Sequence, residues 1–366
     1  MPRGPYTPWS TADVETLRGL VNDEKDAPTI ARTMGRPLGS IRNKLQALRL
    51  AIKAKRFSSE PATDAQRWQA MRDRAVEEVS HKKEVYDWLQ PVQMQAPPRQ
   101  KVTSTPNPYT LVAGDQHFGM QDDRACGLFL GAVEAIKPKR VILNGDTVDL
   151  LAVSRYPKDY RHGKTWKLQD EVVAFHSFLH TLHSIGDGWG LEVIETSANH
   201  SGNGTDGRWW RYLNDRCPEL LQHGEAEELL SYQRWFFPKW SNIKLEDSVM
   251  LADDLLVMHG DMVRSEAGYT AKASREKWMN SVLVNHTHRM GFAPKTITAI
   301  QGKPTSYVRG YENGCLCKLE VPYGRALNWQ QGFAIVSEGS GSFGVEQVLI
   351  DNGQADIATL GRTLRA

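Results

Sequence analysis

Apolar residues recur at helical spacing in three short segments near the start of the chain. The first segment begins after Ser10, where Asp13 completes a capping box in place of the usual glutamate. The second segment is centred on Ile30, and the third follows a proline and is centred on Ile41. The pattern predicts three packed helices that form a small unit over residues 1–56.

A connecting region follows this unit. Residues 64–90 place apolar side chains on one stripe, which predicts a long amphipathic helix. We expect the stripe to pack on a domain or on another copy of the chain, so that self-association is one interpretation of it. Five prolines then punctuate the sequence, and they favour an extended segment. The whole region, 57–108, is therefore predicted to be a helix followed by a linker.

From Tyr109 the pattern changes to short apolar strands that alternate with helical segments. The stretches "YTLVAGDQH", "RVILNGDTVD", "LEVIETSANH" and "LLVMHGD" each end in polar residues. This alternation predicts an α/β domain over 109–351, with its functional side chains at the carboxyl ends of the strands. After Tyr307 the chain is rich in strands and glycine, so we expect further antiparallel strands. Residues 352–366 are predicted to be a C-terminal tail.

Composition narrows the class of protein. The chain has 366 residues, 40% of them hydrophobic and 24% charged, which is ordinary for a globular protein. It contains no apolar run long enough to cross a bilayer, and its start has no apolar core of a secretory signal. We therefore expect a cytoplasmic protein with reduced thiols. Cys315 and Cys317 are expected on one face of a strand, with a Cys-x-Cys metal site as the alternative.

The charge distribution is uneven despite a net charge of +2. Between residues 27 and 56 there are eight basic residues and no acidic one. This run is either a solvated helix surface or a binding site for phosphate groups. On the third predicted helix, polar side chains point away from the apolar stripe with basic residues beside them; the candidate contacts are Arg36, Arg42, Asn43, Lys44 and Gln46.

Three helices with a glycine-bearing turn and a basic third helix resemble a helix-turn-helix of the Myb/SANT-like kind. The resemblance implies that DNA is a partner. Many trihelical modules bind proteins instead, and that alternative stays open. A second basic stretch, "GRWWRYL", sets Arg208 and Arg211 beside tryptophans. These arginines either bind a phosphate backbone or are solvated residues beside a tryptophan that anchors the core.

The polar residues at the strand ends form the main chemical pattern of the chain. They mix carboxylate, imidazole and amide groups, and in chain order they are Asp115, His117, Asp146, Asn199, His200, His259, His286 and His288. Such a mixture suits a pair of divalent ions, manganese first, with iron or zinc as alternatives. Magnesium is possible but fits less well, because it prefers oxygen ligands.

The order of these blocks resembles the signature of calcineurin-like metallophosphoesterases, which is Asp-x-His, Gly-Asp-x-x-Asp, Gly-Asn-His-Asp/Glu, Gly-His and Gly-His-x-His. The resemblance implies a four-layer αββα sandwich with two metals where its sheets meet. By position, one metal would be held by Asp115, His117 and His288, with Asp146 bridging to the other. The second metal would be completed by Asn199, His259 and His286.

In this resemblance His200 binds no metal but faces the substrate and protonates the leaving oxygen or stabilises charge. Two metals together can activate a bridging water as hydroxide for in-line attack on a phosphoester. The chain departs from the signature at three positions. Ala198 replaces a glycine, Ser201 stands where an acid follows the histidine, and Asn285 replaces a glycine. Asp149 occupies the position of a supporting aspartate.

These observations lead to one expected function and two alternatives. The first is a two-metal phosphodiesterase or nuclease that acts on DNA, with residues 1–56 as its targeting module. The second is a phosphatase or phosphodiesterase for nucleotides or phosphoproteins, which would use the same metal ligands. The third is a DNA-binding regulatory protein whose metal site is vestigial. The intact ligand set speaks against the third.

Overall fold

The computed structural model describes residues 9–23, 25, 27–48, 94–154, 167–201, 207–222, 230–298, 306–321, 327–339 and 341–366. The chain divides into two compact units, Met1–Glu78 and Val79–Ala366. The predicted helix over 64–90 lies outside the described residues. None of the described helices is long and apolar enough to cross a membrane.

The N-terminal unit contains the three predicted helices, α1 (Thr11–Asn22), α2 (Ala27–Thr33) and α3 (Leu38–Ala47). The capping box at the start of α1 is formed: the Ser10 hydroxyl accepts from the Asp13 amide at 3.1 Å, and the Asp13 carboxylate accepts from the Ser10 amide at 2.9 Å. The helices share a small apolar core of Leu17, Val21, Ile30, Ile41 and Leu45.

The second unit is built on two sheets. The larger sheet has the strand order β13-β12-β11-β10-β1-β2-β3-β4. Strands β1 to β4 pair in parallel, whereas β10 to β13 pair antiparallel, as expected for the later part of the chain. The strands are β1 (Asn107–Ala113), β2 (Pro138–Leu143), β3 (Glu192–Thr196), β4 (Lys244–Glu246), β10 (Gln331–Gly339), β11 (Ser342–Asp351), β12 (Gln354–Ile357) and β13 (Arg362–Arg365).

The smaller sheet has the order β5-β6-β7-β9-β8, with β6, β7 and β9 parallel. Its strands are β5 (Val249–Leu251), β6 (Leu255–Met258), β7 (Ser281–Val284), β8 (Met290–Ile297) and β9 (Ser306–Asn313). Short helices lie in the connections of the unit, namely η1 (Leu151–Val153), η3 (Asp187–Trp189), α7 (Arg208–Arg216), η4 (Pro218–Gln222), α9 (Tyr232–Phe236) and η5 (Ala358–Leu360).

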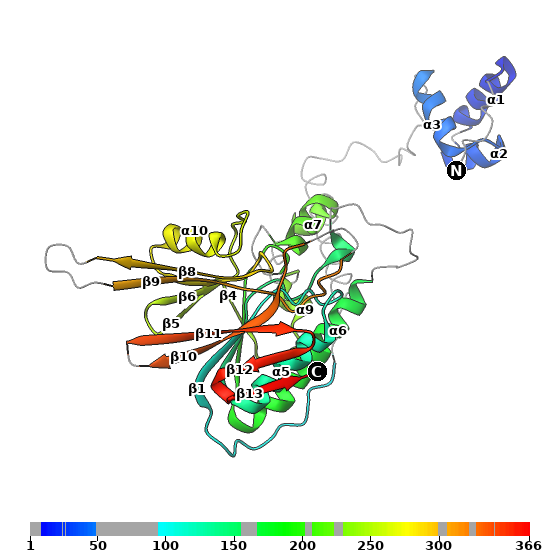
Figure 1. Ribbon diagram of the computed structural model, residues 1–366. Coiled ribbons are helices and arrows are strands. Elements are labelled where there is room, and N and C mark those ends of the chain that lie inside the picture. Colours follow the sequence, from blue (N-terminus) through cyan, green and yellow to red (C-terminus); the bar gives the residue numbers. More distant parts are fainter. Residues whose placement is uncertain are drawn as a thin grey trace, which may run out of the picture. The chain divides into compact units, whose positions relative to one another are not determined.

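The two sheets face one another, and helices cover their outer sides. One apolar cluster lies between the sheets, with Val112 and Val336 from the larger and Val257 and Leu283 from the smaller. A larger cluster lies between the large sheet and α5 (Asp123–Ile136) and α6 (Leu168–Gly186). Helix α10 (Tyr269–Trp278) covers the other outer face (Figure 1). The α/β class is confirmed, and the layers follow one another as helix, sheet, sheet and helix.

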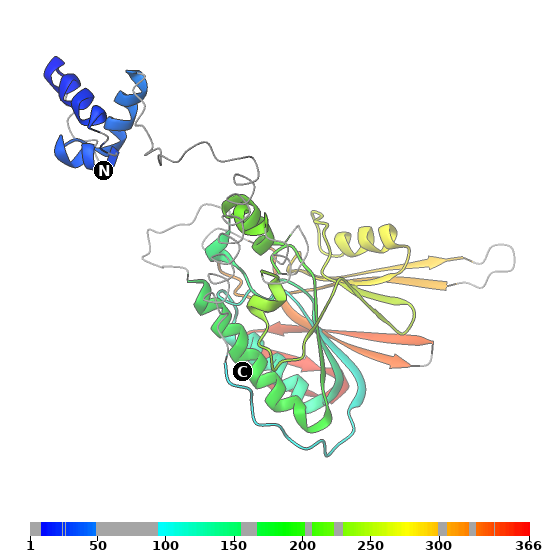
Figure 2. The ribbon, with the colours of Figure 1, turned by 180° about the vertical axis from the view of Figure 1, so that it is seen from behind.

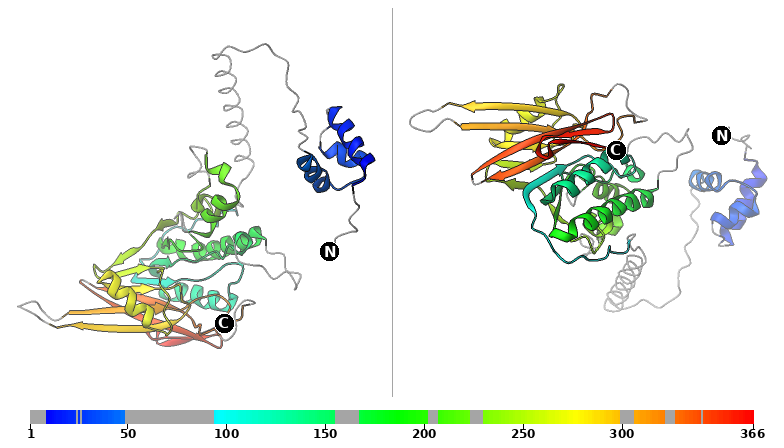
Figure 3. Two further views of the ribbon diagram at one scale, coloured as in Figure 1. Left: turned by 90° about the horizontal axis from the view of Figure 1, so that it is seen from above. Right: turned by 60° about the horizontal axis from the view of Figure 1, so that its bottom comes forward.

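Other views show the same layers. From behind, the green helix α6 runs along the outer face of the larger sheet (Figure 2). From above, the yellow helix α10 lies over the strands of the smaller sheet, and the green helix α6 lies away from it (Figure 3). Apolar runs such as "LVA" in β1 and "VIL" in β2 are buried on both faces, because helices and a second sheet cover them.

The predicted C-terminal tail over 352–366 is wrong. Strands β12 and β13 occupy this segment and extend the larger sheet beyond β11. Alternate residues of β12, Ala355 and Ile357, are buried in the cluster beneath α5 and α6. A four-residue strand has too short an alternation to be recognised in sequence, but its pairing with β11 gives it a stable place.

The described part of the predicted linker, 94–106, forms no helix or strand, yet it is held against the second unit. The Thr103 amide donates to the carbonyl oxygen of Gly188 at 2.9 Å, and the Met94 carbonyl accepts from the Trp240 indole at 2.8 Å. The anchored part of the domain therefore begins before the predicted boundary at residue 109.

Replacing Phe129 with alanine should lower the free energy of unfolding of the second unit by about 3–5 kcal/mol, since the substitution leaves a cavity. Phe129 is fully buried in α5, and its ring centroid lies 5.4 Å from that of Phe333. Urea denaturation followed by circular dichroism measures the effect. Leu349→Ala, at a half-exposed position on β11, is the control and should cost less than about 1 kcal/mol.

Candidate metal centre

The predicted ligands follow the carboxyl ends of strands from both sheets and converge where the sheets meet. Strands β1, β2 and β3 supply those of the larger sheet, and β6 and β7 supply those of the smaller sheet. The structure brings them into two adjoining groups, in which Asn199 and His286 are half-buried and the other members are buried. Together the groups contain Asp115, His117, Asp146, Asn199, His259, His286 and His288.

The backbone at this junction is strained. Five of the candidate ligands have positive φ, a region that residues other than glycine rarely adopt. The angles are 54° at Asp115, 48° at His117, 49° at Asp146, 72° at His286 and 58° at His288. Strained backbone of this kind persists where the surrounding fold enforces it, and it often coincides with functional sites. Here it turns successive polar side chains towards a common centre.

The first group consists of Asp115, His117 and His288. The Nδ1 atom of His117 lies 2.8 Å from the Asp149 carboxylate and donates to it, so its Nε2 atom can offer an electron pair. That Nε2 lies 3.1 Å from Nε2 of His288, and Asp115 Oδ1 lies 3.6 Å and 3.2 Å from these two nitrogens. Among the described residues, no hydrogen-bond partner reaches this buried oxygen. Three electron-pair donors therefore converge.

The second group is arranged in the same way. The Nδ1 atom of His259 donates to the carbonyl oxygen of Asn144 at 2.9 Å, which turns Nε2 inward. This Nε2 lies 3.2 Å from both Asp146 Oδ2 and the Asn199 side-chain oxygen. The His286 ring packs edge-on against that of His259, with centroids 5.2 Å apart. Asp146 also groups with His117 on the side of the first cluster, so it lies between the two.

The chemistry of both groups fits divalent cations. Burial lowers the pKa of the imidazoles, but neighbouring carboxylates outweigh it and raise the pKa of His117 to about 10 and that of His259 to about 9. Without a cation, a second proton on each ring supplies the positive charge that the carboxylates attract. A divalent ion would replace those protons and accept all the converging electron pairs. Mixed nitrogen and oxygen donors suit manganese, iron or zinc.

Asp149 supports two histidines at once. Its Oδ1 lies 2.8 Å from Nδ1 of His117 and 3.3 Å from Nδ1 of His200. Burial raises the pKa of Asp149, but contacts with both histidines lower it well below its usual value. The acid that the signature places after His200 is replaced by Ser201 in this chain. Asp149 supplies a carboxylate from another loop and can orient the His200 ring in its place.

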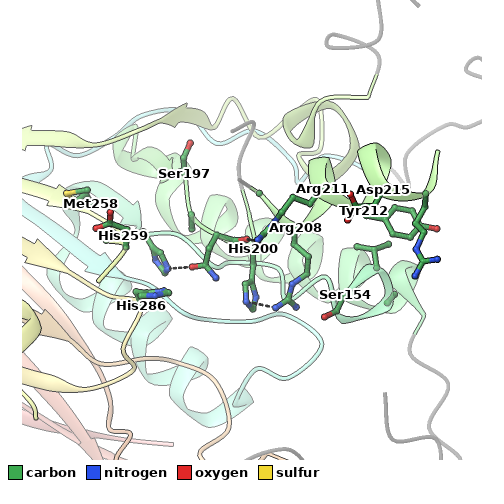
Figure 4. A pocket seen from close by; sticks show the side chains of 18 of the residues that line it. Ser154, Ser197, His200, Arg208, Arg211, Tyr212, Asp215, Met258, His259 and His286 are labelled. Atoms are coloured by element: carbon green, nitrogen blue, oxygen red, sulfur yellow. Dashed lines mark hydrogen bonds between the residues drawn. The ribbon is translucent and has the colours of Figure 1, made fainter. Parts of the chain in front are cut away.

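His200 lies at the edge of the centre and contacts an arginine (Figure 4). Its backbone amide donates to Asp146 Oδ1 at 2.8 Å, and its ring Nε2 accepts from the Arg208 guanidinium. Arg208 also donates to the carbonyl oxygen of Asp149 at 2.6 Å. Burial lowers the pKa of His200, against the opposing charge of Asp146. Arg208 was predicted as a phosphate contact, and the structure places it on His200 inside the site.

Two asparagines connect the sheets beside the donor groups, and sequence reasoning did not identify their role. The Asn144 side chain donates to the carbonyl oxygen of Met258 at 2.9 Å and to the Asn285 side-chain oxygen at 2.8 Å. The Asn285 amide donates in turn to the carbonyl oxygen of Gly314 at 2.9 Å. Asn285 stands where the signature has glycine, so this departure adds a buried connection. The available clue was an asparagine directly after each of two apolar strands.

A thiol and an indole lie behind His288. Cys317 Sγ is 3.7 Å from its Nδ1 atom, and the Trp329 ring centroid is 4.2 Å from that of the imidazole. Cys315 and Cys317 are both buried. Each takes part in an isolated β-bridge, and neither belongs to a regular strand, contrary to expectation. The segment bends because its backbone also bonds to the Asp115 loop.

A cleft of about 940 Å³ leads away from the centre. At its inner end are His200, His259 and His286, and α7 forms the wall that extends outward (Figure 4). Arg211, predicted as a phosphate contact, lies on this wall and donates to the carbonyl oxygen of Asn199 at 3.1 Å. The site therefore opens into a space with arginines on one side.

The predicted nucleic-acid contacts of the N-terminal unit have different environments. Arg36 forms an ion pair with Asp13 at 2.9 Å and lies over the Trp9 ring, 4.4 Å from its centroid. Lys44 lies 5.5 Å from the same centroid. Arg42 and Asn43 are exposed on α3, while the side chain of Gln46 lies outside the described residues. Arg36 and Lys44 thus contribute to packing, and Arg42 and Asn43 remain available to a partner.

The sequence is similar to two viral proteins. It is 24% identical over 238 residues to the Gene 54 protein of Mycobacterium phage D29, which covers 62% of this chain and 88% of that protein. It is 23% identical over 235 residues to the Gene 54 protein of Mycobacterium phage L5, with the same coverage. The sequence matches no protein-family profile.

Some solved structures are also similar to this chain, at low sequence identity. One is wild-type Vps29 of Entamoeba histolytica complexed with zinc, which is 12% identical to this chain. The match covers 70% of this chain and 98% of that chain, with a TM-score of 0.33. Another is the Pseudomonas putida nuclease MPE, which is 11% identical to this chain. The match covers 65% of this chain and 87% of that chain, with a TM-score of 0.28.

Proposed function

We propose that this protein is a two-metal-dependent phosphoester hydrolase that acts on DNA as a phosphodiesterase or nuclease. The observation that supports it most is the pair of buried donor groups that share Asp146 at the inner end of an open cleft. The order of the sequence blocks, which resembles that of calcineurin-like metallophosphoesterases, supports the same chemistry. The phosphoester would enter from the cleft and reach His200 at its inner end.

Asp115, His117 and His288 would hold one ion, and Asn199, His259 and His286 the other, with Asp146 shared between them. When bound, two such ions activate water and stabilise the charge on the phosphoryl oxygens. The protein's own groups position the leaving oxygen. His200 faces the cleft, with Asp149 beside its Nδ1 atom. Its Nε2 atom accepts from Arg208, so it would carry a proton to the leaving oxygen once the Arg208 guanidinium turns to the phosphoryl group of the substrate.

The size and charge of the cleft favour a phosphodiester substrate. A free phosphate group would occupy a small part of about 940 Å³, so the cleft has room for groups on both sides of the scissile phosphorus. Arginines on α7 provide positive charge along one wall. Arg42 and Asn43, exposed on α3, offer a separate surface that can bind a phosphate backbone.

One assay tests the proposal and its main alternative. Protein loaded with manganese is incubated with single-stranded, duplex and nicked DNA, with a chromogenic phosphodiester, and with a phosphomonoester. Hydrolysis of DNA and of the diester is expected. Preference for the monoester would identify a phosphatase. Inactivity on every phosphoester, at two bound metals per chain, would indicate a regulatory protein.

Asp146→Asn should reduce occupancy of both metal positions together, from two ions per chain towards none, because the lost carboxylate charge lies between the two groups. Metal analysis after manganese loading and desalting measures this. Asp254→Asn, at an exposed position in the turn between β5 and β6, is the control and should keep two ions. Loss of a single ion from the Asp146 variant would show that the carboxylate serves one position alone.

His200→Ala should keep both metals but slow hydrolysis of diesters with a basic leaving group by about 10²–10⁴-fold. Diesters with a good leaving group should be affected much less, since their leaving oxygen needs no proton. Rates for a series of aryl and alkyl diesters, beside metal analysis, measure the difference. If the rates fall equally across the series, or metal is lost, His200 has a structural or ligand role.

Deleting residues 1–56 should leave hydrolysis of a small chromogenic diester nearly unchanged, since every candidate ligand lies in the other unit. Binding to long DNA should weaken by roughly 10²-fold, because two linked sites bind more tightly than one. The affinity for long DNA should also depend less steeply on salt concentration. Arg42→Ala should reproduce part of the loss, and Arg18→Ala, exposed on α1, should not. Unchanged DNA binding by the truncated chain would favour a protein partner for the module.

A further inference from the structure

We propose that the outer part of the cleft is a subsite for the nucleotide next to the scissile phosphate. In this subsite Tyr212 stacks on an unpaired base and Arg216 binds the adjoining phosphate, so the substrate is a single-stranded polynucleotide. The inference rests on the proposed phosphodiesterase function and specifies its substrate class.

The side chains of α7 that line the cleft lie along one face of the helix. They occur at positions 208, 211, 212, 215 and 216, which is the spacing of successive helical turns. Arg208 is at the end next to His200, and Tyr212 and Asp215 lie further along the helix, away from the metal centre (Figure 4). The cleft therefore continues past the reactive centre along two turns of helix.

The length of this wall exceeds what one phosphate requires. Arg216 lies eight positions after Arg208 on the helix, which corresponds to about 12 Å along its axis. A wall of this length can accompany more than one phosphate of a strand, whereas a mononucleotide would leave its outer end unused.

Of the three arginines on this wall, two already have acceptors in the protein. Arg208 donates to His200 and Asp149, and Arg211 donates to Asn199. Arg216 is exposed, and among the described residues no ion pair or hydrogen bond engages its guanidinium. Asp215, also exposed, is the single acid on this wall. Arg216 is thus the cation available for a phosphate beyond the reactive one.

Tyr212 presents an aromatic face that is supported from behind. Its ring lies nearly parallel to that of Trp209, at 18° and with centroids 6.3 Å apart. Trp209 is buried, and its indole donates to the carbonyl oxygen of Leu230 at 2.7 Å, so it is fixed in place. The half-buried Tyr212 ring lines the cleft. A fixed aromatic ring beside a cationic side chain is the usual arrangement for binding single strands.

This arrangement requires an unpaired base. In a duplex both faces of each internal base are covered by its neighbours, and no face is left for Tyr212. A base in a single strand can leave its stack at small cost and lie on the ring. We therefore expect single-stranded DNA to be cut with higher kcat/KM than a duplex of the same sequence.

The test compares a short single-stranded oligonucleotide, its duplex and a chromogenic phosphodiester, all with manganese-loaded protein. For each variant the measured quantity is the ratio of kcat/KM for the oligonucleotide to that for the chromogenic diester. Tyr212→Leu should lower this ratio roughly tenfold or more, and Tyr212→Phe, which keeps the ring, should preserve it. Arg216→Ala should lower it as well and should reduce the slope of log KM against log salt by about 0.7.

Matched controls are Tyr269→Leu on α10 and Arg124→Ala on α5, both at exposed positions outside the cleft. Neither should change the ratio. A second measurement, binding of a fluorescent oligonucleotide to the metal-free protein, reports on the subsite without hydrolysis. It should be weakened by Tyr212→Leu and by Arg216→Ala.

The outcomes separate the two levels of the proposal. Failure to hydrolyse the chromogenic diester, with both metals bound, contradicts the phosphodiesterase function, and oligonucleotide binding then still decides whether the subsite exists. If the diester is hydrolysed but the ratio and the binding are the same in the Tyr212→Leu and Arg216→Ala proteins, the subsite is refuted. Equal cutting of duplex and single strand also refutes it.

Discussion

The architecture of this protein depends on holding strained turns in place at the junction of two sheets. Five candidate ligands adopt positive φ, at a cost of about 1–3 kcal/mol for each such residue. A domain is stable by about 5–15 kcal/mol in total, so this strain is a sizeable part of what packing must offset. The apolar cluster between the sheets and the Asn144–Asn285 contact bring the two sets of turns together. Without both sheets the donor groups would separate.

The same junction places negative charge in a buried environment. Asp115 and Asp146 are almost inaccessible to solvent, and an isolated buried carboxylate is costly. Nearby imidazoles reduce this cost by holding additional protons, as the raised pKa values of His117 and His259 indicate. Metal binding should therefore release protons, and the site should contribute more to folding when cations are present.

The sequence was sufficient to predict the α/β class and the polar side chains that converge where the sheets meet, because each of these residues follows an apolar strand. It was not sufficient where the role of a residue depends on contacts between distant segments. Asp149 lies beside the rings of both His117 and His200, and Arg208 contacts the His200 ring, but neither relation is visible in a linear pattern. In the N-terminal unit, Arg36 was expected to face a partner, whereas its contacts with Asp13 and Trp9 hold it within the fold.

The C-terminal hairpin has a consequence for solubility. Among the described strands, β13 is an outer edge of the larger sheet, and it is only four residues long with Arg362 and Arg365 on it. Short, charged edges resist pairing with other molecules. Strand β11 is ten residues long, and the hairpin pairs with it at Ile350 and Asp351. The hairpin therefore covers the backbone groups at the end of β11, where a neighbouring chain would otherwise pair and promote aggregation.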